Sequence, residues 1–301
     1  MTKPQKSQKE IQTLEEGLDS FDAKKRKGSL LTLLDMAEDG WIELAEQKEI
    51  ANLHCHSFYS YNGYGYSPTH LAWLGKKFGI AFMGIVDFDV LDGVEEFLDA
   101  CEIAGIKGAA GIETRVHIPQ FREAEINSPG EPGVAYHMGT GFTSSKIPDS
   151  VASAFLSIRQ RAVQRNQQIL KKVCVFLSPL TMDYEEDVLP LTPSGYATER
   201  HMVQKIAEKA AETFADPIAF WSQKLDLSTG EVGQKIEDPN GFMNLLRNLL
   251  MKRGGVGYVQ PDEKSFPTVD EFIRSFLLPR LSHVQPGWMG HQWVNSRLKL
   301  C

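Results

Sequence analysis

Apolar positions follow a helical period in the first part of the chain. Leu30, Leu33, Leu34 and Ala37 share one face of a helix with 3.6 residues per turn. Residues 1–49 are therefore predicted to form an N-terminal helical extension. The basic run at residues 24–27 is interpreted as a solvated helix face, with contact to an anionic partner as the alternative.

After residue 49 the pattern changes to short apolar runs separated by helical segments. This alternation is typical of an α/β fold with a mostly parallel sheet. Strands are predicted at residues 50–56, 81–87, 108–116 and 134–139. Residues 50–149 are accordingly predicted to hold the first βα units of a barrel.

Capping signals mark the two helices between these strands. The first helix is predicted to begin after Ser67, with a proline at its first position, and to end before Gly79. For the second, Asp92 and Glu95 have the spacing of a capping box, and Gly105 marks the end.

Residues 150–255 keep one apolar helical face and are predicted to form an inserted helical subdomain. Arg159 and Arg165 lie in its first helix. A guanidinium group pairs bidentately with phosphate oxygens, so both side chains are candidates for substrate binding. A solvated basic face is the alternative. Residues 256–301 are predicted to return to the barrel and to end in an atypical C-terminal tail.

Composition limits the function. The chain of 301 residues carries 32 basic and 39 acidic side chains, which gives a net charge of −7. This acidic balance argues against a nucleic-acid partner. No apolar run approaches the roughly 20 residues of a membrane-spanning helix, and the first residues lack the pattern of a signal peptide. A cytoplasmic location without membrane contact is therefore expected.

Two histidines at the end of the first predicted strand are candidate metal ligands. Side chains alternate along a strand, so His54 and His56 share one face while Cys55 points to the other. Two imidazoles on one face suit a divalent metal ion. The alternative is a pair of structural histidines.

Carboxylates follow two other predicted strands. Asp87 and Asp89 end the second strand, and Glu113 lies near the end of the third. The carboxyl ends of parallel strands gather at one edge of a sheet or barrel, so Asp87 and Glu113 are expected to converge with the histidines. A buried ionisable group needs a partner, and a metal ion supplies one.

The motifs around these residues resemble those of a known family, the PHP (polymerase and histidinol phosphatase) family of metal-dependent phosphoesterases. The motifs are LHCHSFYSYNGYGYSP, GIVDFDVLDGVEEF and AAGIETRV, followed by the looser YHMGTGF, RHMVQKIAEKA and RGGVGYV. The resemblance extends in order over residues 50–275.

This resemblance implies a distorted (β/α)7 barrel that binds two or three zinc, manganese or iron ions and hydrolyses phosphate esters. By position, His54 and His56 match the paired histidine ligands, and Glu113 matches the bridging carboxylate. His201 and His137 fall where the family keeps histidines near the site. The family pattern makes Asp87 and Glu113 the catalytic carboxylates.

Departures from the family pattern imply fewer metal ions. Asn62 stands where the family has an aspartate, and Phe88 stands where it has a histidine ligand. The last 26 residues contain no equivalent of the family's His-Pro and Asp-x-His strands, and His283 and His291 match neither. An incomplete barrel is expected, whether through divergence, truncation or a frameshift, and with it a protein partner that covers the open edge.

Two hypotheses follow from the sequence. In the first, the chain is a divergent metal-dependent phosphoesterase that hydrolyses a small phosphorylated molecule with a metal-activated water. In the second, it is a non-catalytic relative that binds a metal ion or a phosphorylated ligand, or acts as a scaffold.

Overall fold

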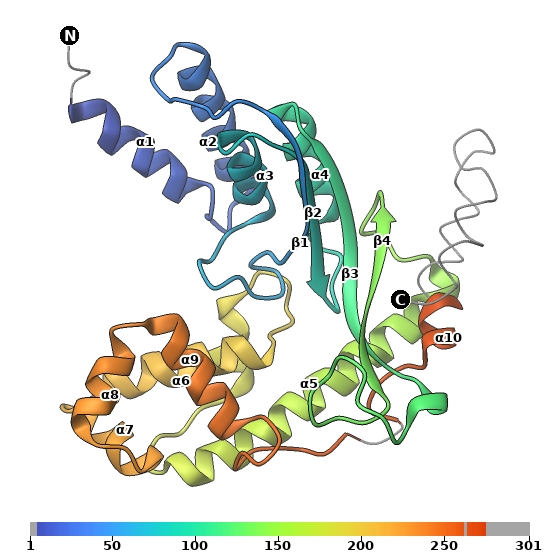
Figure 1. The fold of residues 1–301 in the computed structure, drawn as a ribbon, viewed down its shortest axis with the longest axis vertical. Coiled ribbons are helices and arrows are strands. Elements are labelled where there is room, and N and C mark those ends of the chain that lie inside the picture. Colours follow the sequence, from blue (N-terminus) through green and yellow to red (C-terminus); the bar gives the residue numbers. More distant parts are fainter. Residues whose placement is uncertain (1–4, 262–263, 275–301) are drawn as a thin grey trace.

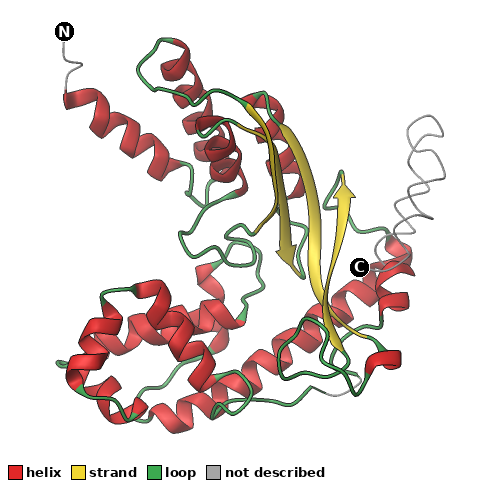
Figure 2. Cartoon of the chain, viewed as in Figure 1, coloured by secondary structure: helices red, strands yellow, loops and turns green. Residues whose placement is uncertain are grey.

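The computed structural model describes residues 5–261 and 264–274, which form an α/β fold (Figure 1). A curled four-stranded sheet is flanked by helices on one side, and a separate group of helices lies beyond its lower end (Figure 2). The tail residues beyond 274, including His283 and His291, lie outside the described residues.

The sheet has the strand order β1-β2-β3-β4. Its members are β1 (Lys48–Cys55), β2 (Ile80–Phe88), β3 (Lys107–His117) and β4 (Val134–Phe142). The first three strands are parallel, as predicted, but β4 runs antiparallel to β3. The link between β3 and β4 contains only a short turn of 3-10 helix, η1 (Pro119–Phe121), and parallel pairing requires a longer crossover.

Helices α3 (Pro68–Lys77) and α4 (Val94–Ala104) cover one face of the sheet. Their Trp73 and Phe97 pack with Ile85 of β2 and Ile112 of β3, and all four side chains are buried. The apolar side of each strand therefore faces these helices, and the polar side of the strand ends faces the opposite, concave side.

The predicted boundaries of α3 are confirmed. The Ser67 side chain accepts a hydrogen bond from the backbone N–H of His70, and Gly79 ends the segment at φ +69°. A side chain at position 79 would clash with the carbonyl oxygen of Glu46, so only glycine fits this turn.

The predicted capping box of α4 is wrong, although its end at Gly105 is confirmed. The helix begins after Gly93, without a side-chain cap. The carboxylate of Glu95 instead accepts hydrogen bonds from the Ser144 hydroxyl and the Ser145 backbone N–H. A long-range contact thus takes the acceptor that a local cap would use.

The N-terminal helices α1 (Gln5–Gly17) and α2 (Ala23–Glu38) pack beside α3. Leu30 and Leu33 join the core, as their spacing predicts. Arg26 departs from the predicted solvated face, because it is only 2% exposed. Its guanidinium makes a bidentate ion pair with Glu96 of α4, and this pair joins the extension to the sheet layer.

The stretch 150–255 is mostly helical. It contains α5 (Asp149–Leu177), α6 (Glu199–Thr213), α7 (Pro217–Leu225), α8 (Thr229–Ile236) and α9 (Pro239–Leu250), with the short turns η2 (Tyr184–Val188) and η3 (Leu189–Leu191). Their apolar faces form a second core. Helix α5 belongs to both cores, because Phe155 and Ile158 contact the sheet layer while Ile169 and Val173 contact the other helices.

The sheet resembles part of a barrel. Within the described residues, β1 pairs only with β2, and Ile50 and Leu53 of β1 are about half exposed. The short helix α10 (Val269–Phe272) returns to the sheet beside β3 and β4, where Phe272 is buried. This arrangement is consistent with the predicted incomplete barrel and does not test the seven-unit form. None of the described helices is long and apolar enough to cross a membrane.

The Arg26–Glu96 pair leads to a stability prediction. Replacing Arg26 with glutamine leaves Glu96 without its strongest partner, which should lower the free energy of unfolding by about 3 kcal/mol. Urea denaturation followed by circular dichroism measures this change. Lys27→Gln removes the same charge from the exposed face of the same helix and should change stability by less than about 0.5 kcal/mol. Equal effects of the two substitutions would contradict the structural role of Arg26.

Candidate metal centre

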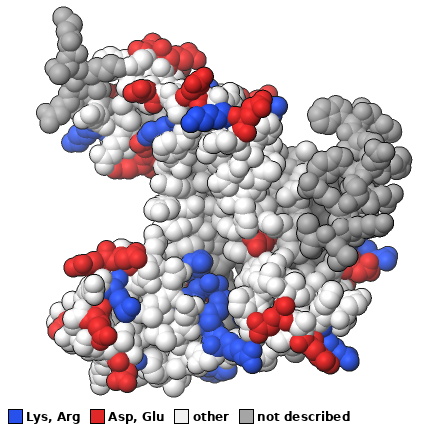
Figure 3. Space-filling model, in the orientation of Figure 1, with Lys and Arg blue, Asp and Glu red and all other residues white. Residues whose placement is uncertain are grey.

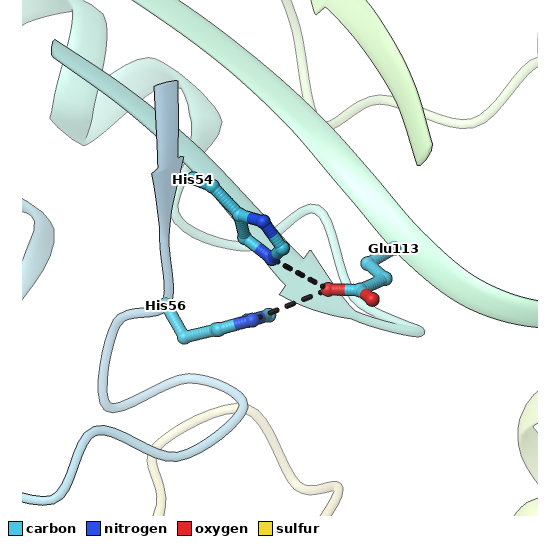
Figure 4. A group of neighbouring side chains, drawn as sticks. All are labelled: His54, His56 and Glu113. Atoms are coloured by element: carbon cyan, nitrogen blue, oxygen red, sulfur yellow. Dashed lines mark hydrogen bonds and ion pairs between the residues drawn. The ribbon is translucent and has the colours of Figure 1, made fainter. Parts of the chain in front are cut away.

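Three side chains from two strands converge at one edge of the sheet (Figure 4). The Nε2 atoms of His54 and His56 each lie 3.2 Å from Oε2 of Glu113. One possible ligand atom from each of the three residues lies within 4.8 Å of the other two. Among the described residues, these three side chains therefore form the candidate metal group. The predicted convergence of His54, His56 and Glu113 is confirmed, but Asp87 is not part of the group, because it is in register with Ile112 on the other face of the sheet.

The strands explain this arrangement. Strand β1 ends at Cys55, so His54 and His56 bracket its end and point to the same side. Strand β2 lies between β1 and β3, and its last residue, Phe88, is in register with Glu113. Parallel pairing thus brings the end of β1 and the middle of β3 to the same level.

The geometry fits a divalent ion. Ligand atoms in a tetrahedral zinc site are roughly 3.4 Å apart, given metal–ligand distances of about 2.1 Å. The observed 3.2 Å separations are close to this value. Two imidazoles and a carboxylate that is 7% exposed form a donor set suited to a divalent metal ion.

Two neighbours restrict the site. The ring of Phe88 stacks on the ring of His56 at 4.4 Å, so an apolar ring lies where the family pattern has a histidine. The Asn62 side chain is used by its own loop, donating to the His56 carbonyl and accepting from the Tyr64 N–H. The Nδ1 atom of His56 is buried and has no partner among the described residues, although metal-binding imidazoles ordinarily have one.

Asp87 lies at the end of β2, where its carboxylate is buried and holds the loop after β1. It accepts hydrogen bonds from the Ser57 N–H and hydroxyl and from the Ser60 hydroxyl, at 2.6 to 2.7 Å. Burial raises the pKa of Asp87, and these three hydrogen bonds oppose the rise. Through these contacts Asp87 positions the segment that carries His56.

The structure does not bring His201 and His137 into the metal group. His201 is buried at the start of α6, where its Nδ1 accepts a hydrogen bond from the Thr198 N–H, and burial lowers its pKa to about 3. His137 of β4 is in register with Thr114, one residue beyond Glu113, and therefore points to the helix-covered face. Its ring contacts Phe272, and burial lowers its pKa.

The two predicted substrate-binding arginines have different surroundings. Arg159 donates to the Ser194 carbonyl and lies over the ring of Tyr196. Arg165 is buried in a cluster of charged side chains, where its Nη1 lies 3.1 Å from Glu199. The rest of this cluster was not found from the sequence, because its members are scattered over β3, two loops and two helices. They are Arg115, Glu131, Glu199, Arg247 and Lys252.

Comparisons with known proteins identify fold relatives only. No described protein family and no curated protein matches the sequence. The solved structures that are similar to this chain include the following two. A candidate metal-dependent phosphoesterase from Bifidobacterium adolescentis has 14% identity and a TM-score of 0.48 over 77% of this chain and 64% of its own. An amidohydrolase from Chromobacterium violaceum, solved with sulfate and without metal, has 15% identity and a TM-score of 0.52 over 81% and 70%.

The likeness to the amidohydrolase shows a shared fold, and it says nothing about the activity of this chain. The chain spans less than two thirds of the length of the phosphoesterase. Neither likeness singles out the PHP family.

The contacts of Asp87 predict a second stability effect. Asp87→Ala leaves three buried donors of Ser57 and Ser60 without their acceptor, which should lower the free energy of unfolding by about 3 kcal/mol. Urea denaturation measures the change. The control is Asp99→Ala on the exposed face of α4, which should have little effect. A stable Asp87→Ala protein would show that the carboxylate does not hold this loop.

Proposed function

We propose that this protein is a divergent metal-dependent phosphoesterase of the PHP type that acts on a small phosphorylated molecule. The observation that carries the proposal is the convergence of His54, His56 and Glu113 at the strand ends. A bound divalent ion would supply Lewis acidity and a water of lowered pKa. The motifs around the three residues and the shared hydrolase fold support this choice.

The residues of the chain have distinct roles in this proposal. His54, His56 and Glu113 would hold the ion, and Asp87 would keep His56 in place through Ser57. The exposed fraction of the His54 side chain, 54%, leaves the group open to solvent and thus to a substrate. Phe88 and Asn62 offer no additional ligand, so the proposal includes fewer ions than the family pattern has.

A large cavity bordered by the loop after β1 supports a small-molecule substrate, although His54, His56 and Glu113 are not among the residues that line it. Its volume is about 770 Å³, and its lining is rich in apolar and aromatic side chains from the loop after β1 and from helices α6, α7 and α9. Asn62 lines this cavity and also donates to the carbonyl of His56. Such a cavity suits the organic part of a phosphate ester.

A non-catalytic relative remains the second candidate function. The unpartnered Nδ1 of His56 favours it, because a metal-binding imidazole without a supporting acceptor typically binds its ion 10- to 100-fold more weakly, in order of magnitude. A cytoplasmic location and a protein partner over the open sheet edge remain predictions.

Metal content tests the proposed centre. The purified protein should retain about one equivalent of zinc, manganese or iron after reconstitution and desalting, measured by plasma mass spectrometry. The double substitution His54→Ala, His56→Ala should abolish retention. His137→Ala is the matched control and should retain the ion, because that ring lies on the other face of the sheet. A metal-free wild type would refute the proposal.

Catalysis needs a separate measurement. The metal-loaded protein should release phosphate from at least one member of a panel of sugar and nucleotide phosphates, and Glu113→Gln should reduce kcat/KM at least about 100-fold. A protein that binds metal but hydrolyses no member of the panel would favour the non-catalytic alternative.

The stacked ring of Phe88 predicts a gain of metal. Phe88→His places an imidazole against His56 and should raise the retained metal above that of the wild type. Phe88→Leu is the control, because it removes the ring without adding a ligand. Equal metal content in both variants would show that position 88 cannot contribute to a second ion.

A further inference from the structure

A second, smaller cavity lies between the sheet and the helices, next to the candidate metal group. Its volume is about 70 Å³, which is enough for a few waters or one small oxyanion. Four guanidinium groups line it, together with the carboxylates of Asp89 and Glu199. The arginines are Arg115, Arg165, Arg200 and Arg247. Figure 3 shows Lys and Arg side chains gathered on the face between the sheet and the helical part.

Arg165 has unused hydrogen-bond donors in this cavity. The residue is only 8% exposed, and its Nε and Nη2 atoms have no hydrogen-bond partner among the described residues. Nη2 lies 3.7 Å from Glu131, which is too long for a hydrogen bond. Buried donors of this kind are costly unless a bound group accepts from them. Nε and Nη2 are also the adjacent pair with which a guanidinium holds an oxyanion.

The surrounding charges favour an anion. Arg115 stacks on Phe266 and pairs with Glu131, and Arg247 pairs with Glu199. Arg200 donates to the neutral side chain of Asn244, so the four arginines and Lys252 outnumber the carboxylates of Asp89, Glu131 and Glu199. Burial lowers the pKa of Arg165, and Arg115 lowers it further, while Glu199 and Glu131 oppose the decrease.

We propose that this cavity binds a phosphate group through Arg165, with Arg115, Arg200 and Arg247 supplying further positive charge. The site is separate from the metal group but close to it. Arg115 follows Glu113 by two residues on the same face of β3, a step of roughly 7 Å. Phe88 lines the cavity and stacks on His56.

This closeness defines a substrate class, an inference that rests on the proposed function. The substrate is a small molecule with two phosphate groups, of which the metal group holds the one that is hydrolysed and the arginine cavity holds the other.

Binding of inorganic phosphate to the metal-free protein tests the site independently of catalysis. Isothermal titration calorimetry in the presence of a chelator should show saturable phosphate binding to the wild type. Arg165→Gln should weaken this binding at least about tenfold, since it removes a charge-assisted, bidentate contact. Arg253→Gln removes an exposed cation beside Lys252 and should leave phosphate affinity within about twofold of the wild type.

Two further variants separate the possible outcomes. Arg165→Lys keeps the charge but lacks the paired donors, so it should also weaken binding, and it decides the test if Arg165→Gln fails to fold by circular dichroism. The variant His54→Ala, His56→Ala should bind phosphate as the wild type does. Wild-type affinity in Arg165→Lys, or loss of binding in the double histidine variant, would overturn the arginine site. Neither result depends on whether the protein retains metal or hydrolyses an ester.

Discussion

Parallel pairing of β1, β2 and β3 is the constraint on which the rest of the structure depends. Pairing in one direction brings the ends of β1 and β2 to the level of the middle of β3, and helices α3 and α4 cover one face of the sheet. His54, His56 and Glu113 therefore meet on the other face. His54 and His56 reach Glu113 there only because β2, which lies between them, ends at the same level.

Hydrogen bonds to a buried carboxylate keep this edge in place. Asp87 accepts from Ser57 and Ser60, so the segment after β1 is fixed to the end of β2. A buried ionised group is tolerated when it has such partners. The interaction gives His56 a defined position without a metal ion. Its Nδ1 has no hydrogen-bond partner among the described residues, so His56 should bind a metal ion more weakly than an imidazole that has one.

The helical part adds the second functional region. Helix α5 packs on the sheet layer at one end and on α6 and α9 at the other, and this position brings Arg165 beside Arg115 of β3. Burial alone would raise the pKa of Glu199, but Lys252 and the neighbouring arginines hold it well below its ordinary value. Glu199 and Glu131 thus offset only part of the charge of the arginines and Lys252, and the remaining positive charge is available to a bound anion.

The sequence by itself determined the strands, the capped start of α3 and the shared face of His54 and His56, because these depend on local periodicity and on neighbours in the chain. Convergence with Glu113 also followed, since strand ends in a parallel sheet must meet at one edge. Only the tertiary structure decided the antiparallel direction of β4, the burial of Arg26 and the position of His137 on the other face. These features arise from contacts between residues far apart in the sequence, which local patterns do not encode.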